Sequence, residues 1–439
     1  MRIVGLILCV AATGINGVDA NCLQTEPSGT ELKLTVNCAV SDALQPTIGS
    51  YTSITIIGVP DSNGQRPTWT NFQFNSVTDG TMDGSSPQTG IAVLNITNLI
   101  LHTDDINGFA IVGLNTRAYL KNVHIEGYSK SAGTGLQAGG AVALFAADYS
   151  SDPTDVYAIQ DVTTDNTCIG IAFYMSQSPR IKNTIVYNAT DNCFVLASNP
   201  FGTPKHPSAD GTTNGRIENS AAMRCGHHGI MLAGGGDNVV IDSVVGSTAG
   251  PGIQVFNLNN NQVEIRNIIF DKANSLPGTK VLGTGDNIND YDGAVIGASS
   301  VSPDTNGVVN VYNCTFRGGG VLNDATLPDS KVYKAEGNMQ IAFNSPMSVY
   351  DETQFGTTIL NSDYLRPMSS APSPAPSPAP SPAPTHDSDD SNDKRDLAIG
   401  LGVGVPLGVI FIGGVGYYCY KKQNNIVPRI DDGATVPFM

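Results

Sequence analysis

The sequence predicts an all-β fold in which short strands wind into a solenoid, the parallel β-helix. Charged residues make up only 14% of the 439 residues, and long amphipathic helices are hard to find. Short apolar runs bounded by Gly, Asn, Asp, Ser and Thr recur instead, which indicates strands. An aliphatic residue followed two places later by Asn, Asp or Ser also recurs, mostly every 22 to 24 residues. Such a period is typical of a repeat architecture.

The first 20 residues have the pattern of a secretory signal peptide. Arg2 precedes an apolar stretch from Ile3 to Ala12, and the small residues Val18 and Ala20 fit a cleavage site after Ala20. Residues 21–92, which contain the single tryptophan, are expected to form an N-terminal cap and the first coils.

Residues 93–366 carry the repeat and are predicted to form the β-helix itself. A strand that cannot cover its own apolar face can stack on the same strand of the next coil. The recurring Asn then lies at a tight turn, where its amide can bond the Asn of the coils above and below. The alternative is a β-sandwich whose spacing is coincidental. The recurring pairs are Ile96/Asn98, Leu120/Asn122, Ile159/Asp161, Ile181/Asn183, Ile217/Asn219, Ile241/Ser243, Ile265/Asn267 and Val311/Asn313.

From Val93 to Phe316 the pattern resembles the right-handed parallel β-helix superfamily of pectate lyases, polygalacturonases and uronan epimerases. The resemblance implies a right-handed coil and an extended polysaccharide bound along one face. "GHHG" at 226–229 is similar to a polygalacturonase element, but "RIK" at 180–182 precedes it and the paired aspartates are missing, which disfavours a hydrolase. "HGIML" at 228–232 resembles segments of alginate epimerases, although their DPHD-type motif is absent.

The cysteines and sequons suit a secreted domain. Cys22 and Cys38 flank a predicted hairpin and are the expected disulfide. One pair among Cys168, Cys193 and Cys225 could also form, while Cys314 is expected to be a buried free thiol. No Cys or His spacing indicates a metal site. The preferred glycosylation sites are Asn95 and Asn188.

Basic residues and histidines gather between Arg180 and His228, although the chain has a net charge of −16 and only six histidines. Counted from the recurring aliphatic residues, Asp191 and His227 share one position on neighbouring coils. Coils about 4.8 Å apart would let Asp191 accept a hydrogen bond from His227. The alternative is a solvated polar turn. We take Asp191, His227 and His228 as candidate catalytic residues, and Arg180, Lys182, Lys205, His206 and Arg224 as candidate ligand-binding residues.

The C-terminal part predicts a stalk, a membrane span and a tail. Residues 367–396 contain "APSPAPSPAPSPAPT", which favours an extended polyproline II conformation, about 3.1 Å per residue. Residues 397–420 are uncharged and long enough to cross a bilayer as one helix. Two lysines follow, which places residues 421–439 in the cytoplasm of a type I plasma-membrane protein. A cleaved GPI signal is the alternative, which the charged tail disfavours.

Three functions remain open on these residues. The first is a non-catalytic ectodomain that binds extracellular polysaccharide, another wall or matrix component, or a surface partner. The second is a lyase or C5-epimerase, in which a base abstracts the sugar C5 proton while cations neutralise its carboxylate. The third is an adhesive spacer. No cofactor is expected, although Ca²⁺ could take part with an acidic polysaccharide. Nucleic acid is disfavoured because no extended basic surface is visible.

Overall fold

A computed structural model describes residues 22–41, 51–76, 91–103, 108–129, 139–198, 211–256, 261–271, 273, 295–299, 307–317, 333–335, 339–345 and 348–349. All of them lie in the first of two units of the chain, Met1–Ser369. No helix within these ranges has the length and apolarity to cross a membrane. The predicted signal peptide (1–20), stalk (367–396), membrane span (397–420) and tail (421–439) lie outside the described residues.

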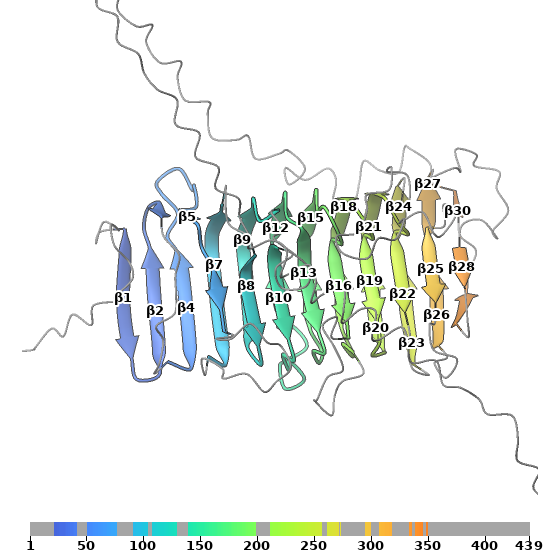
Figure 1. The fold of residues 1–439 in the computed structure, drawn as a ribbon, viewed down its shortest axis with the longest axis horizontal. Coiled ribbons are helices and arrows are strands. Elements are labelled where there is room, and N and C mark those ends of the chain that lie inside the picture. The colour runs from blue at the N-terminus through green and yellow to red at the C-terminus, as the bar shows by residue number, and fades with distance from the viewer. Residues whose placement is uncertain are drawn as a thin grey trace, which may run out of the picture. The chain divides into compact units, whose positions relative to one another are not determined.

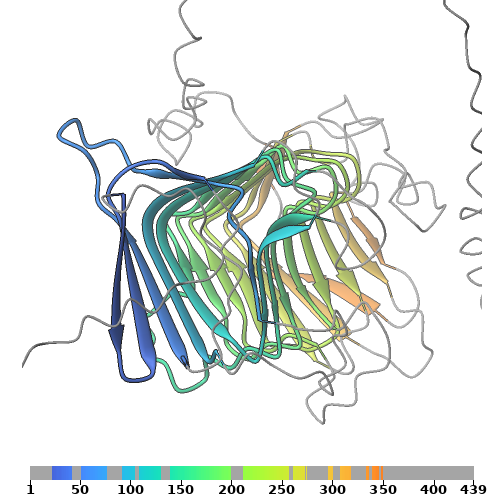
Figure 2. The same cartoon turned by 60° about the vertical axis from the view of Figure 1, so that its left-hand side comes forward.

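The described strands form a parallel β-helix. Successive coils stack so that equivalent strands stand side by side in chain order (Figure 1). They form one sheet of 21 strands and a second sheet of nine. The larger sheet bends within each coil, so a coil has three strand positions, which we call the first, second and third columns (Figure 2).

The first column begins each coil, and its strands pair in parallel from coil to coil. In β7 and β9 the strand continues into the second column without a break. The first-column strands are β2 (Glu31–Val36), β4 (Ser53–Gly58), β7 (Val93–His102), β9 (Arg117–Glu126), β11 (Ile159–Gln160), β14 (Arg180–Lys182), β17 (Arg216–Glu218), β20 (Asn238–Ile241), β23 (Gln262–Arg266), β26 (Gly307–Tyr312) and β29 (Met339–Phe343).

From β11 to β27, two residues separate each first-column strand from the second-column strand that follows it. The third column, which is the nine-stranded sheet, follows another turn. The second-column strands are β3 (Val40–Ser41), β5 (Thr68–Thr70), β12 (Thr163–Asp165), β15 (Ile185–Tyr187), β18 (Ala221–Cys225), β21 (Val244–Thr248), β24 (Ile269–Asp271), β27 (Thr315–Arg317) and β30 (Ser348–Val349). The third-column strands are β6 (Phe74–Asn75), β8 (Phe109–Leu114), β10 (Gly140–Phe145), β13 (Ile169–Tyr174), β16 (Phe194–Ala197), β19 (Ile230–Ala233), β22 (Ile253–Phe256), β25 (Ile296–Ser299) and β28 (Tyr333–Ala335).

The predicted repeat is the structural register. The aliphatic residues of the recurring pairs face one another on successive first-column strands, from Ile96 against Leu120 to Ile265 against Val311. One pair is shifted by a residue, because Ile217 faces Val240 and not Ile241. The turn residue of that coil is therefore Asp242, with φ 51°, while the hydroxyl of Ser243 is turned to the Ile241 carbonyl.

The turn after the first column is built from left-handed residues that bond one another. The eight turn residues have φ between 47° and 56°, a region that Asn and Asp tolerate better than other side chains. Asn122 donates to Asn98 at 2.9 Å, and Asn219 donates to Asn183 at 2.6 Å. The eight are Asn98, Asn122, Asp161, Asn183, Asn219, Asp242, Asn267 and Asn313.

The N-terminal end of the described solenoid is a hairpin. β1 (Leu23–Ser28) pairs antiparallel with β2, whereas the other named strands in the described residues pair in parallel. The predicted disulfide between Cys22 and Cys38 is present, with 4.9 Å between the Cα atoms. The hairpin therefore occupies the edge of β2 that a further coil would otherwise extend.

The interior of the coil is apolar along its described length. Alternate residues of all three columns point inward, as in Ile181, Val186 and Phe194 of one coil, each fully buried. Cys314 is buried as a free thiol, as predicted, and burial raises its pKa to about 11. The outer face of the third column is also apolar, which bears on the candidate site described next.

Candidate functional site

The candidate site lies on the turn between the second and third columns. Asn166, Asn188, Arg224 and Ser247 occupy equivalent left-handed positions at the start of this turn, with φ between 51° and 58°. Arg224 is exposed, and its guanidinium carbon lies 5.8 Å from the centre of the Tyr187 ring. The turn therefore presents a cation and an aromatic ring at the surface.

Asp191 and His227 lie side by side, as the register predicted. Asp191 Oδ1 is 3.2 Å from His227 Nδ1, and the His227 backbone amide donates to the Asp191 carbonyl at 3.2 Å. The side chains are 23% and 19% exposed, respectively. A carboxylate on Nδ1 orients the imidazole and directs its Nε2 atom away from Asp191. This is the arrangement in which a carboxylate positions a histidine base.

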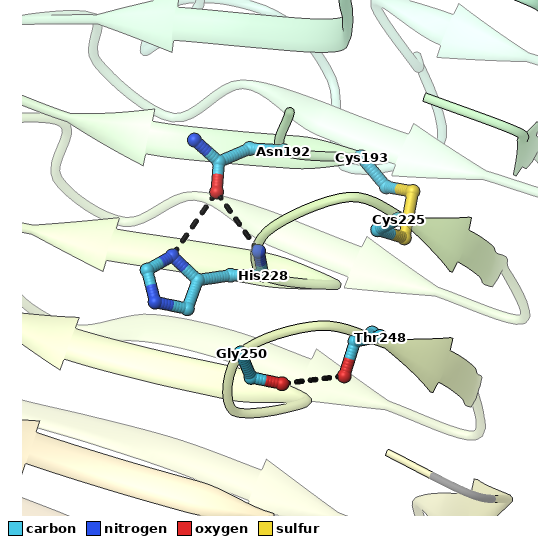
Figure 3. Close-up of a disulfide and its surroundings, with 6 residues drawn as sticks. All are labelled: Asn192, Cys193, Cys225, His228, Thr248 and Gly250. Atoms are coloured by element: carbon cyan, nitrogen blue, oxygen red, sulfur yellow. Dashed lines mark hydrogen bonds between the residues drawn. A yellow bond between two sulfur atoms is a disulfide. The ribbon is translucent and has the colours of Figure 1, made fainter. Parts of the chain in front are cut away.

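His228 is not on the surface, although the sequence placed it with His227 among the candidate catalytic residues. Its residue exposure is 2%, and burial lowers the pKa of the imidazole well below its usual value, with a further contribution from His227. Asn192 Oδ1 accepts from the His228 backbone amide at 3.2 Å and lies 3.1 Å from its Nδ1 atom (Figure 3). His228 is therefore a neutral residue of the turn interior.

The two imidazoles lie against one another with their planes tilted by 31°, and the next coil packs against them. Their ring centres are 3.6 Å apart. Gly250 of the next coil lies next to both rings. A Cβ atom added at Gly250 would come within 3.0 Å of His228 Cδ2 and 3.3 Å of His227 Cδ2. Figure 3 shows Gly250 on the neighbouring coil, with its carbonyl accepting from Thr248 Oγ1 at 2.6 Å.

A disulfide joins the coils of Asp191 and His227. Cys193 and Cys225 are bonded, with 5.7 Å between their Cα atoms (Figure 3). This is the pair that the sequence left open among three cysteines, and Cys168 remains a buried free thiol. The bond holds the two coils together within two residues of the histidine turn.

The other basic residues predicted to bind ligand lie away from the histidine turn. Lys182 Nζ and Arg216 Nε lie 2.9 and 2.6 Å from the carboxylate of Glu218. Burial opposes ionisation of Glu218, but hydrogen bonds from Arg216 and Lys182 hold its pKa at about 2. Lys182 stands on a first-column strand, so the second column separates it from His227 along the coil. Its charge is balanced there.

Arg180 is likewise occupied, since it donates to the Pro153 carbonyl at 2.5 Å. Of the predicted site residues, Asp191, His227 and Arg224 lie on the turn between the second and third columns, Asp191 on one coil and the other two on the next. Arg180 and Lys182 lie on the first-column strand β14. Lys205 and His206 lie outside the described residues.

The outer face of the third column adds no acid or base. No charged residue occurs in its strands β6 to β25. The outward residues include Phe145 and Tyr174, whose rings stack at 4.7 Å and whose exposures are 0% and 4%. The Asp191–His227 turn therefore places a carboxylate and an imidazole next to a sheet face whose strands β6 to β25 carry no charged residue.

A second group of titratable residues escaped the sequence analysis. On the outer face of the second column, the carboxylate of Glu126 lies 2.9 Å from His102 Nδ1 and 3.2 Å from His124 Nε2. Thr163 Oγ1 lies 2.7 Å from His124 Nδ1. The hydrogen bond from His124 is the largest cause of a lowered pKa of Glu126, and burial raises the pKa of the neighbouring Asp165.

The spacing contained the signal for this group. His102 and Glu126 each lie six residues after the aliphatic residue of their coil, so the register places them against one another. Across the described ranges, no group of three or more His, Cys, Asp or Glu has the geometry of a metal site.

No protein-family model matches the chain. No curated protein matches it either. Several solved structures do. The catalytic domain of a family GH87 α-1,3-glucanase in complex with nigerose is 14% identical, with a TM-score of 0.35, over 72% of this chain and 54% of that chain.

An alginate lyase from Paenibacillus sp. is 12% identical with a TM-score of 0.34, over 70% of this chain and 99% of that one. A variant of the periplasmic alginate epimerase AlgG is 10% identical with a TM-score of 0.35, over 76% and 80%. The chain spans about half the length of the glucanase domain.

Proposed function

We propose that the chain is a single-pass type I plasma-membrane protein whose right-handed β-helix binds extracellular polysaccharide, or another wall or matrix component, without transforming it. The observation that carries the proposal is the makeup of the site. Asp191 and His227 form one partly exposed carboxylate–imidazole pair beside an uncharged apolar sheet face. Glycoside hydrolysis uses two carboxylates that flank the bond. The described site offers one.

Proton abstraction from a uronic acid also lacks support in the neighbouring charges. Such a reaction needs a base and a cation to neutralise the sugar carboxylate. Lys182 and Arg216 pair with Glu218, which leaves Arg224 as the exposed cation of the described histidine turn. Arg224 with Tyr187 instead suits binding, where an aromatic ring covers a sugar and a guanidinium donates to its oxygens.

A solenoid suits an extended polymer because its surface repeats. Equivalent positions recur about every 4.8 Å along the axis, so one chain of sugars can meet successive coils. The stalk at 367–396 and the span at 397–420 would hold that surface away from the bilayer.

A glycan array probed with the full-length chain in detergent tests binding. We expect one class of polysaccharide to bind, and His227→Ala to weaken that binding about tenfold or more. His102→Ala is the matched control, because it removes another partly exposed histidine that pairs with a carboxylate. Equal loss in both variants, or binding unaffected by His227→Ala, contradicts this site.

A lyase or C5-epimerase is the second candidate, favoured by the Asp191–His227 contact itself. Incubation with alginate or polygalacturonate tests it. Elimination would raise the absorbance near about 235 nm, since proton abstraction ends in an unsaturated acid. Epimerisation would change the ratio of uronic acids in the NMR spectrum. We expect neither change.

The membrane topology is tested on intact cells. Protease added outside should release the folded part by cutting between Ser369 and Arg395, while an epitope on the tail at 421–439 stays protected. A tail that antibodies reach without permeabilisation would contradict the orientation.

A further inference from the structure

A pocket lies on the outer face of the first column, on another strand position from the histidine turn. It spans β7, β9 and β11 and has a volume of about 380 Å³. A pocket of this size is at the lower end of the range for small-ligand sites. It is lined by Asn95, Thr97, Tyr119, Leu120, Lys121, Asp155, Val156, Tyr157 and Gln160.

The two tyrosines of the pocket are held by their hydroxyl groups. Tyr119 donates to Asp152 Oδ2 at 2.7 Å, and Asp152 is itself bound by Arg117 at 3.1 Å. Tyr157 donates to Glu218 Oε1 at 2.8 Å and accepts from Lys182 Nζ at 3.3 Å. Because each hydroxyl is engaged outside the pocket, the rings are fixed before any ligand binds.

The chain segment that forms one wall is fixed at both ends. Asp152 is tied to Arg117 and Tyr119, while the Pro153 carbonyl accepts from Arg180. At the other end Tyr157 is bound to the Glu218 network. Residues Asp155 to Tyr157 between these points line the pocket. The wall is thus preorganised by residues of three different coils.

Asn95 opens an N-glycosylation sequon, "NIT", inside this pocket. Asn95 and Thr97 are two residues apart on β7, so both side chains lie on the same outer face, and both line the pocket. Asn95 is half-buried, and its Nδ2 atom donates to Thr55 Oγ1 at 3.3 Å. An N-linked sugar leaves one hydrogen on this nitrogen, so that hydrogen bond can persist.

We propose that this pocket seats a pyranose sugar against Tyr119 and Tyr157, and that the sugar is the first of an N-linked glycan on Asn95. In the modification, Asn95 Nδ2 loses a proton and bonds to the sugar C1 atom. The bond from C1 to the phosphate of a lipid-pyrophosphate oligosaccharide donor breaks, and the lipid pyrophosphate leaves with the electron pair.

The lining has the chemistry of a sugar seat. Tyrosine rings cover the apolar faces of a sugar, and the volume of about 380 Å³ suits one or two rings. Lys121 and Gln160 in the lining supply donors for its hydroxyls. A soluble glycan has the same chemistry as an attached one, so the experiment separates these two sources. The proposal does not depend on the histidine turn.

The full-length chain, expressed in cells that N-glycosylate, is treated with a peptide N-glycosidase both folded and denatured. Mass spectrometry follows the release from Asn95. We expect Asn95 to carry a glycan that is released at least about fivefold more slowly from the folded chain, since a contact of ordinary strength corresponds to such a factor. Tyr157→Leu and Tyr119→Leu should remove this protection, whereas the matched Tyr157→Phe and Tyr119→Phe, which keep the rings, should retain it.

Gln160→Trp is the second variant, because it fills the pocket without removing a hydroxyl contact of either tyrosine. It should also expose the glycan to the enzyme. Melting curves establish that each variant is folded. A glycan on Asn95 whose release is the same in wild type, the leucine variants and Gln160→Trp overturns the proposal.

If Asn95 is unmodified, N,N′-diacetylchitobiose is added to the chain and followed by saturation-transfer NMR. Saturation transfer that Tyr157→Leu or Gln160→Trp abolishes supports the sugar seat and assigns it to soluble glycans. An unmodified Asn95 together with no tyrosine-dependent saturation transfer overturns it. Since neither readout involves His227, the outcome is distinguishable from failure of the proposed polysaccharide site.

Discussion

Asp191 and His227 occupy the same position on two neighbouring coils, with 3.2 Å between Asp191 Oδ1 and His227 Nδ1. One residue later, Asn192 and His228 repeat the relationship with 3.1 Å between Oδ1 and Nδ1. The first pair is partly exposed and the second is buried. The two histidines of one dipeptide thus have different roles.

His228→Ala should destabilise the fold far more than His227→Ala. Removing a buried imidazole leaves a cavity and one hydrogen bond fewer on Asn192, and we expect a loss of about 2–3 kcal/mol. His227 is partly exposed, so its loss should cost about 1 kcal/mol or less. Thermal unfolding of the two single variants, followed by circular dichroism, measures this difference.

The reverse order, or equal melting temperatures, would contradict the burial of His228. Binding to polysaccharide provides an independent readout, because only His227→Ala should weaken binding while leaving the melting temperature nearly unchanged.

Sequence periodicity predicts the coils well because each strand must bury every second residue in the interior of the coil. A shift by one residue would expose that whole set. In one coil the sequence prediction chose Ile241 and Ser243 where the structure has Val240 and Asp242, and this error has a local cause. Asp242 and Ser243 are adjacent polar residues that both suit a turn, and only the pairing of Ile217 with Val240 distinguishes them.

Among the left-handed turn residues that follow the first column, we expect Asn183 to be the most sensitive to substitution. Its Nδ2 donates to Asp161 at 3.0 Å, its Oδ1 accepts from Asn219 at 2.6 Å, and its φ is 49°. Asn183→Ala loses both bonds and places an alanine in the left-handed region, which should cost about 2–4 kcal/mol.

Asn183→Gly is the matched control for the backbone. Glycine adopts a positive φ without strain, so it should recover roughly 1 kcal/mol of the loss while leaving the hydrogen bonds missing. If urea denaturation shows glycine to be no better than alanine, backbone conformation is not what selects Asn here.

The site was harder to predict than the coils because a turn has no alternation that separates inside from outside. Register alone placed His227 against Asp191, yet it gave no reason to bury His228 and expose His227. The number of basic residues in the sequence was misleading for another reason. Counting Lys and Arg over residues 180–228 suggested a positive patch, whereas Glu218 alone pairs with both Lys182 and Arg216.

Glu218 should make the fold sensitive to acid. Its folded pKa of about 2 lies below the ordinary 4.5, so it contributes stability above about pH 4.5. That contribution is lost as the pH falls from 4.5 towards 2, when the carboxylate is protonated. Melting temperatures of wild type and Glu218→Gln across this range should converge at low pH, with wild type the more stable at pH 6. A difference that stays constant with pH would contradict the Glu218 network.

The disulfide between Cys193 and Cys225 should hold the histidine turn together. It closes a loop of 32 residues, and constraining the unfolded chain by that much corresponds to about 3–4 kcal/mol. Cys193→Ala combined with Cys225→Ala should therefore lower the melting temperature, and it should loosen the coil contact that aligns Asp191 with His227.

A matched comparison separates this local effect from general destabilisation. Cys22 and Cys38 close a shorter loop of 16 residues in the N-terminal hairpin, away from the histidine turn. Since the stability of a solenoid is roughly a sum over neighbouring coils, removing that bond should lower stability without changing the turn. The histidine signals in the NMR spectrum should shift in Cys193→Ala/Cys225→Ala and stay in place in Cys22→Ala/Cys38→Ala. Equal shifts in both would show that the second disulfide does not position the Asp191–His227 pair.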